Sequence, residues 1–112
     1  DWAGYLTIAT ACTSDPTNEG LLRTAISRAY YAAFHAARDY TGVTTRGEKG
    51  SHREVWDALE QGQGRRPEVA RKGYELKRLR EFADYDDDFN GNLVKQAAYS
   101  LVIAKEIIAK MS

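Results

Sequence analysis

The stretch RTAISRAYYAAFHAARDYTG, residues 23–42, decides the fold of this chain. Its apolar residues recur every three or four positions, which is the period of an amphipathic helix. Gly42 follows the last apolar position and is typical of a helix end. The expected inward stripe is Leu22, Ala25, Ile26, Ala29, Ala33, Ala36, Ala37 and Tyr40. Because most of these side chains are small, we expect neighbouring helices to approach this one closely.

The segment SDP at residues 14–16 carries the expected start of this helix. Asp15 has a side chain that can cap the first turn, and Pro16 fits the first helical position. Glu19 would then lie in the first turn, where a negative charge is favoured. We therefore expect the helix to run from about Pro16 to about Thr41.

Four other segments show the helical period and predict four further helices. They run from Trp2 to about Thr13, from a capping box at Ser51 and Glu54, from near Pro67, and from Asn92 to Met111. Their expected inward residues are Trp2, Tyr5, Leu6, Ala9, Val55, Trp56, Leu59, Val69, Leu76, Leu79, Ala83, Leu93, Ala97, Leu101, Ala104 and Ile108. Short connections make sequential helices antiparallel neighbours. The sequence predicts one all-α domain over residues 1–112, an antiparallel up-down bundle of four to five helices.

The composition excludes several classes of function for this protein. Sixteen basic and sixteen acidic residues cancel, so the net charge by itself indicates no polyanionic partner. No stretch approaches the roughly 20 apolar residues of a membrane span. The single Cys12 has no partner for an internal disulfide and suits a reducing cytoplasm, where we expect the protein to reside. A glycine-rich phosphate loop, Cys/His metal spacing and a nucleophile elbow are all absent, so we expect no cofactor.

The run DDDFNG, residues 86–91, resembles half of a calcium-binding loop. Asp86, Asp88, Asn90 and Gly91 match positions one, three, five and six of an EF-hand. The twelfth position, which should supply a bidentate carboxylate, is Ala97. Because this ligand is missing, the run is better interpreted as a helix-connecting turn than as a metal site.

Arg80 is the first candidate for a functional residue. Helical geometry places it only about 40° from Leu76 on the apolar face, so its side chain should point toward the bundle or a subunit interface. An inward arginine needs a partner, and Asp84 lies one turn later. The pair has two interpretations at this point: a semi-buried ion pair that stabilises helix packing, or the charged centre of a binding site.

A polar stripe on the helix of residues 23–42 offers a second candidate. Thr24, Arg28, Tyr31, His35 and Arg38 lie within about 80° of one another, opposite the alanine face. An arginine, a tyrosine and a histidine on one face can bind phosphate and move a proton. The same pattern is typical of an exposed helix face or a dimer contact rich in Tyr and Arg. His52, the other histidine, is expected in the first turn of its helix, where the helix dipole favours its neutral form.

Basic residues gather just before Arg80. Residues 65–80 carry seven Lys or Arg against two Glu, and residues 81–88 then carry five acidic residues and no base. The candidates for nucleic-acid backbone contacts are Arg65, Arg66, Arg71, Lys72, Lys77 and Arg78. The alternative interpretation is a solvated helix face followed by an acidic turn.

Three segments together resemble the HEPN domain family of bacteria and archaea. They are RTAISRAYYAAFHAARDYTG, then GSHREVWDAL, then LKRLREFADYD, which cover about Leu22 to Tyr85. The most specific pieces are SRAYYAAFHAA, from Ser27, and LRxxADYD, from Leu79. The resemblance implies a helical bundle that pairs into a homodimer. It also implies an RNA-related role, since many members are metal-independent ribonucleases and others bind RNA or nucleotides without cleavage.

The ribonuclease motif of that family is an arginine followed by a histidine after four to six residues. Arg80 matches the arginine, whereas the histidine positions hold Tyr85, Asp86 and Asp87. The chain looks like a separate branch of the family in which Asp84 and Tyr85 occupy the motif region.

We expect the chain to act on RNA, or to bind RNA or a nucleotide, as one half of a toxin–antitoxin type pair with a nucleotidyltransferase. In this hypothesis Arg80 contacts phosphate, Asp84 orients Arg80, and Tyr85 supplies a hydroxyl or stacks on a base. If the chain cleaves RNA, the attacking 2′-hydroxyl needs a base, and His35 is the candidate. The competing hypothesis is a non-enzymatic interaction module in which the Arg80–Asp84 pair is structural.

Overall fold

The structure is a computed structural model that describes residues 2–43, 51–62, 64–85 and 92–111. These residues form five helices: α1 (Trp2–Ala11), α2 (Glu19–Thr41), α3 (Ser51–Gln61), α4 (Pro67–Tyr85) and α5 (Leu93–Lys110). The described residues contain no strand. The prediction of an all-α up-down bundle is therefore confirmed.

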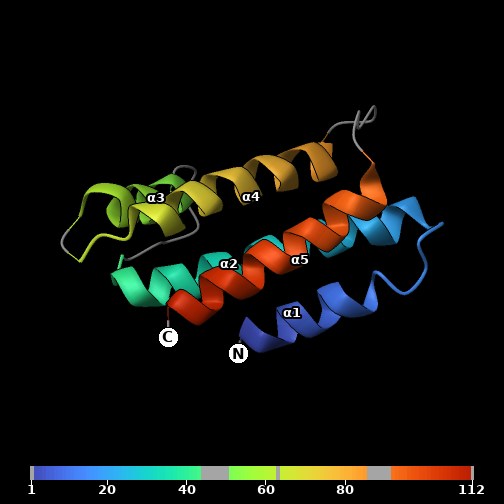
Figure 1. Cartoon of the computed structure of the whole chain (residues 1–112), viewed down its shortest axis with the longest axis horizontal. Helices are drawn as coiled ribbons and strands as arrows, with labels where there is room; N and C mark the ends of the chain where they lie inside the picture. The colour runs from blue at the N-terminus through green and yellow to red at the C-terminus, as the bar shows by residue number, and fades with distance from the viewer. Residues whose placement is uncertain (1, 44–50, 63, 86–91, 112) are drawn as a thin grey trace.

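Helix α2 lies at the centre of the bundle. It packs most extensively against α5 and α1, and it also contacts α4 and α3. Figure 1 shows α4 and α1 on opposite sides of the pair formed by α2 and α5, with the short α3 beside the first half of α4. A helix contacted from several sides buries most of its circumference, so α2 buries more than one stripe.

The burial along α2 confirms most of the predicted stripe and extends it. Leu22, Ala25, Ile26, Ala29, Ala33 and Ala37 are buried. Tyr30, Ala32 and Phe34 are buried as well, although the sequence pattern did not place them in the stripe. Tyr40 was expected inward but is 42% exposed, because it lies in the last turn, where its hydroxyl donates to the carbonyl of Gly64.

The start of α2 differs from the prediction. The N-cap is Asn18, whose side chain accepts a hydrogen bond from the Leu21 amide at 3.0 Å. Asp15 instead accepts from the Thr17 amide and hydroxyl and forms a local turn before the helix. The predicted end is confirmed: Gly42 has φ 71° and its amide donates to the Arg38 carbonyl.

The other helices follow their predicted faces with small shifts. Ala9 of α1, the inward residues of α3, and Val69, Leu76 and Ala83 of α4 are buried. In α5, Ala97, Leu101 and Ala104 are buried as expected, but Ile107 is fully buried whereas Ile108 is only partly so. Helix α1 ends at Ala11 rather than near Thr13. Within the described residues, no helix combines the length and apolar character that a membrane crossing needs.

Candidate functional site

Arg80 projects from α4 toward α2, as its position on the helix predicts. Its side chain is 14% exposed, and its Nη1 lies 3.4 Å from Asp84 Oδ2. The same nitrogen donates to the hydroxyl of Tyr31 on α2, also at 3.4 Å. Arg80 therefore joins the motif region of α4 to the polar stripe of α2.

Two aromatic rings hold the guanidinium of Arg80 in place. Its Cζ lies 5.4 Å from the ring centroid of Tyr30 and 5.6 Å from that of Tyr31, which are cation–π distances. Its Nε is buried and has no hydrogen-bond partner within the described residues. A buried N–H without a partner is costly, and because this nitrogen is sealed from solvent, a bound acceptor would have to reach other atoms of the guanidinium.

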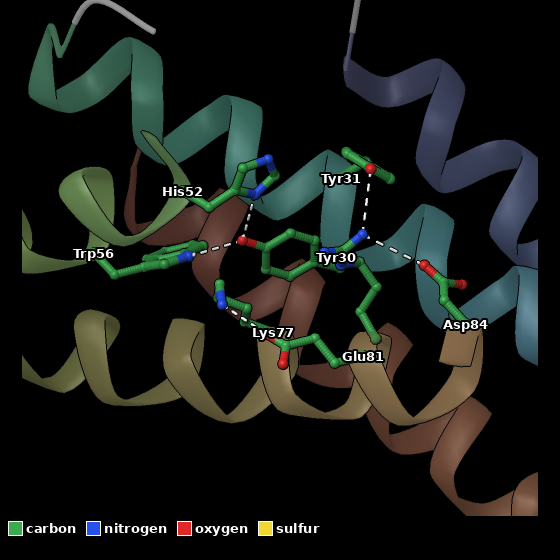
Figure 2. A network of polar contacts seen from close by, with 8 residues as sticks. Tyr30, Tyr31, His52, Trp56, Lys77, Glu81 and Asp84 are labelled. Atoms are coloured by element: carbon green, nitrogen blue, oxygen red, sulfur yellow. Dashed lines mark hydrogen bonds and ion pairs between the residues drawn. The ribbon is translucent and has the colours of Figure 1, made fainter. Parts of the chain in front are cut away.

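A second polar network joins Tyr30, His52 and Trp56, as Figure 2 shows. The indole Nε1 of Trp56 donates to the Tyr30 hydroxyl at 3.0 Å, and that hydroxyl lies 2.9 Å from His52 Nδ1. The Tyr30 ring that carries this hydroxyl is also the ring on which Arg80 rests. The three residues come from α2 and α3, so the site draws on α2, α3 and α4 together.

Burial and nearby cations hold His52 neutral. Its pKa falls to about 4, because burial disfavours the charged form and because Arg80 and Lys77 repel it. The neutral form agrees with the expectation from the helix start, but its main cause is burial rather than the helix dipole. Burial also raises the pKa of the Tyr30 hydroxyl well above its usual range, so this group stays protonated.

Tyr30, His52 and Trp56 are the part of the site that sequence reasoning missed. Tyr30 was not singled out, Trp56 was counted only as core, and His52 was expected only to be neutral at the start of its helix. Tyr30 and His52 are 22 positions apart on different helices. Helical period gives the face of each residue but not the rotation of one helix against another, so no local pattern could pair them.

His35 lies away from this network, beneath α1. Its ring stacks on Trp2, with centroids 4.0 Å apart and planes 10° apart, and it lies 5.6 Å from the ring of Tyr5. Its Nδ1 is buried without a partner within the described residues, and burial lowers its pKa. The interpretation of this stripe as an exposed outer face is wrong, because α1 packs over it.

The two arginines of the α2 stripe contact aromatic rings, whereas the Thr24 hydroxyl donates to the Gly20 carbonyl. The Arg28 Cζ lies 6.0 Å from the centroid of Tyr31, and the Arg38 Cζ lies 5.4 Å from that of Trp2. Tyr31 connects the two groups, since its ring lies 6.3 Å from His35 and its hydroxyl accepts from Arg80. Tyr31 is thus the residue of the stripe that belongs to the Arg80 site.

Tyr85 does not join Arg80. Its side chain is 77% exposed and lines a shallow groove with Arg78, Glu81 and Phe82 on the outer face of α4. The acidic turn at 86–91, with the two other histidine positions of the ribonuclease motif and the residues that resemble a calcium loop, lies outside the described residues.

Half of the predicted basic run is already paired with carboxylates. Arg66 pairs with Glu68 at 2.9 Å, Lys77 pairs with Glu81 at 2.6 Å, and Lys72 pairs with Glu106 of α5. Arg65, Arg71 and Arg78 are exposed, and within the described parts of the chain they form no ion pair. Among the six residues of the predicted basic run, these three side chains are the ones without an ion pair in the part of the chain that the structure describes.

The fold and the site together define the class of protein. It is an all-α up-down bundle in which α2, α3 and α4 meet at Arg80, which lies between Tyr30 and Tyr31. The HEPN domain family matches residues 14–112, so the chain belongs to that family. The resemblance seen in the sequence is thereby confirmed, over a longer stretch that includes α5 but not α1. Domains of this family are in general RNA-related modules. Neither the curated proteins nor the solved structures gave a match to this chain.

Proposed function

We propose that this chain binds RNA, and that Arg80 contacts a phosphate group of the bound strand. The observation that carries the proposal is the environment of Arg80: a guanidinium held by two rings, one carboxylate and the Tyr31 hydroxyl, in a side chain that is 14% exposed. Arginine donates to phosphate oxygens in a fixed planar fork, and this fork is already oriented. Arg65, Arg71 and Arg78 would add backbone contacts that weaken as salt rises.

Binding is favoured over cleavage by the surroundings of the site. Attack by a 2′-hydroxyl needs a general base within hydrogen-bond reach. The motif position held by Tyr85 faces solvent, and His35 stacks beneath Trp2 with no hydrogen bond to Arg80, Tyr31 or Asp84. His35 therefore remains a poor candidate for the base.

The family context supports the rest of the proposal. We place the chain in a toxin–antitoxin type pair of the cytoplasm, with a nucleotidyltransferase as its partner and with two copies of the chain forming a homodimer. Two-fold symmetry would bring two Arg80 sites to one RNA strand. Light scattering coupled to size exclusion measures the oligomeric state, and a monomeric mass at micromolar concentration would contradict the dimer.

The test of RNA binding is a gel-shift and cleavage assay in EDTA at two salt concentrations. The variants are Arg80→Gln and, as a matched control, Arg53→Gln, whose side chain is 79% exposed on α3. We expect Arg80→Gln to weaken binding by about 10- to 100-fold, the loss of one charge-assisted hydrogen bond, with the control unchanged. Equal binding by both variants would contradict the Arg80 site, provided that both melt like the wild type.

A second candidate function is supported by the groove on α4. Phe82 and Tyr85 are exposed beside Arg78, and aromatic residues with arginine are enriched at protein interfaces. In this alternative the chain docks a partner protein through α4, and the Arg80–Asp84 pair is structural. Arg80→Gln would then lower the melting temperature without changing capture of the nucleotidyltransferase, whereas Phe82→Ser with Tyr85→Ser would abolish capture.

A further inference from the structure

We infer that His52 is a second contact for the bound phosphate: Tyr30 and Trp56 hold its imidazole with the proton on Nε2, so it donates a hydrogen bond to a phosphate oxygen and does not act as a general base. This inference rests on the proposed RNA binding at Arg80. It adds a specific residue to that site and states why RNA bound there stays intact.

The position of the proton follows from counting donors. Trp56 Nε1 is a donor only, so the Tyr30 oxygen accepts from it at 3.0 Å. The Tyr30 hydroxyl has one proton of its own, and His52 Nδ1 lies 2.9 Å away. If Nδ1 carried a proton, two donors would point at the phenol oxygen and the buried phenol proton would have no acceptor. Nδ1 therefore accepts, and a neutral imidazole must then carry its proton on Nε2.

Stacking keeps the imidazole in this orientation. The His52 ring lies against Phe34, with centroids 4.0 Å apart and planes 11° apart. The Tyr30 ring also stacks on it, with centroids 5.6 Å apart and planes 15° apart. A ring flip would put Cδ2 in the place of Nδ1 and break the bond to Tyr30, so the packing and the hydrogen bond favour the same state.

The Nε2 side of the His52 ring points away from the Tyr30 hydroxyl that Nδ1 contacts. Within the described residues, the sealed side-chain nitrogens that lack a partner are His35 Nδ1 and Arg80 Nε, and His52 Nε2 is not among them. Figure 2 shows the second ring nitrogen of His52 turned away from Tyr30, on the side where Tyr31 lies. The rings of His52 and Tyr31 are 6.1 Å apart, edge to face, and the Tyr31 hydroxyl contacts Arg80. The two donors thus flank the same pair of tyrosines.

The charges around His52 keep it in the donor state at neutral pH. Its pKa is lowered first by burial and then by Arg80 and Lys77 on α4 and by His35 on α2, while burial keeps the Tyr30 hydroxyl protonated. Of the nearby carboxylates, Glu81 pairs with Lys77 and Asp84 with Arg80. Arg80 therefore supplies the charge for a phosphate, and His52 supplies a neutral hydrogen bond.

The experiment compares two substitutions that separate the two ring nitrogens. In His52→Asn, the side-chain oxygen takes the place of Nδ1 and keeps the bond from Tyr30, but the outward donor is lost. In His52→Gln, the longer side chain brings an amide N–H to the place of Nε2. One probe is a short labelled oligouridylate, titrated at pH 5.5 and at pH 8. The other is inorganic phosphate, titrated at pH 8 only, because its own charge changes between these two pH values. Nitrogen-15 correlation spectra of the wild type report which nitrogen of His52 carries the proton.

We expect His52→Asn to weaken oligouridylate binding about tenfold, the loss of one hydrogen bond, and His52→Gln to restore most of it. In the nitrogen-15 spectra we expect a single form of His52 with its proton on Nε2, and we expect the Nε2 resonance to shift when phosphate is added. The loss of oligouridylate affinity caused by His52→Asn should be the same at pH 5.5 and at pH 8. A purely structural role would not produce the difference between the two variants or the shift at Nε2.

Three results would overturn the inference. The first is a proton on Nδ1. The second is that His52→Asn binds the oligouridylate as tightly as the wild type while Arg80→Gln loses binding. This result would leave the proposed function intact. The third is RNA cleavage by the wild type that disappears in His52→Asn, which would make His52 a base. If the wild type binds neither probe, the proposed RNA binding itself is wrong.

Discussion

Gly73 shows how one residue positions the polar network. It lies in the middle of α4, where glycine is a poorer helix former than alanine by about 0.5–1 kcal/mol. A Cβ at this position would lie 2.2 Å from Cε3 of Trp56. The missing side chain therefore lets the indole lie directly against α4, where its Nε1 can reach the Tyr30 hydroxyl.

We expect Gly73→Ala to destabilise the fold by about 1–3 kcal/mol, because the steric cost of overpacking exceeds the gain in helix propensity. The matched control is Gly4→Ala in α1, where an added Cβ meets nothing within 4 Å and should stabilise by about 0.5–1 kcal/mol. Urea denaturation measures both. Stabilisation by both substitutions would show that Trp56 moves aside at little cost.

At the scale of the elements, α2 contacts all four other helices of the described chain, and a capping side chain determines where it starts. Asn18 caps the helix, while the Asp15 turn precedes it. Helix α1 then packs back over the α2 polar stripe through Trp2 and Tyr5. Since the family match begins at residue 14, this cover lies outside the part of the chain that defines the family.

The corrected cap gives a prediction for α2. We expect Asn18→Ala to lower the free energy of unfolding by about 1 kcal/mol, because the Leu21 amide loses its acceptor. Asp15→Ala removes only an exposed turn contact and should cost less than half as much. Thermal and urea unfolding compare the two variants, and a larger loss for Asp15→Ala would restore the cap first predicted from the sequence.

At the scale of the whole molecule, the two histidines make stability depend on pH. Both pKa values are lowered in the folded state, mainly by burial, and that of His52 falls to about 4. Between this value and the ordinary histidine pKa of about 6.5, the unfolded chain binds more protons than the folded chain. The stabilisation is therefore complete above about pH 6.5 and is lost as the pH falls toward 4.

We expect the free energy of unfolding to decrease from pH 7 to pH 5, measured by urea denaturation. The double variant His35→Gln with His52→Asn should show a flatter profile over this range. The pKa of Glu68 is lowered from 4.5 first by a hydrogen bond with its own backbone and then by Arg66, and that of Glu106 is lowered by Lys72, so these groups act at lower pH and leave this window to the histidines. If the double variant kept the wild-type pH profile, the two histidines would not be the cause of the pH dependence.

The sequence by itself determined the helices, their faces and the family. The helical period placed the α2 stripe, Gly42 ended it, and the position of Arg80 on α4 predicted both its inward direction and its contact with Asp84. These features are local, because they depend on spacings within one helix. The start of α2 was missed since Asp15 and Asn18 are both suitable caps, and the choice depends on the path of the chain that leads into the helix.

Only the tertiary structure decided which side chains meet. It placed Tyr30, His52 and Trp56 beside Arg80, left Tyr85 in solvent, and put His35 under Trp2. It also paired three of the six basic residues that were predicted to contact a nucleic-acid backbone with carboxylates. The physical reason is that the rotation and approach of packed helices depend on many side chains at once, including the absent one at Gly73.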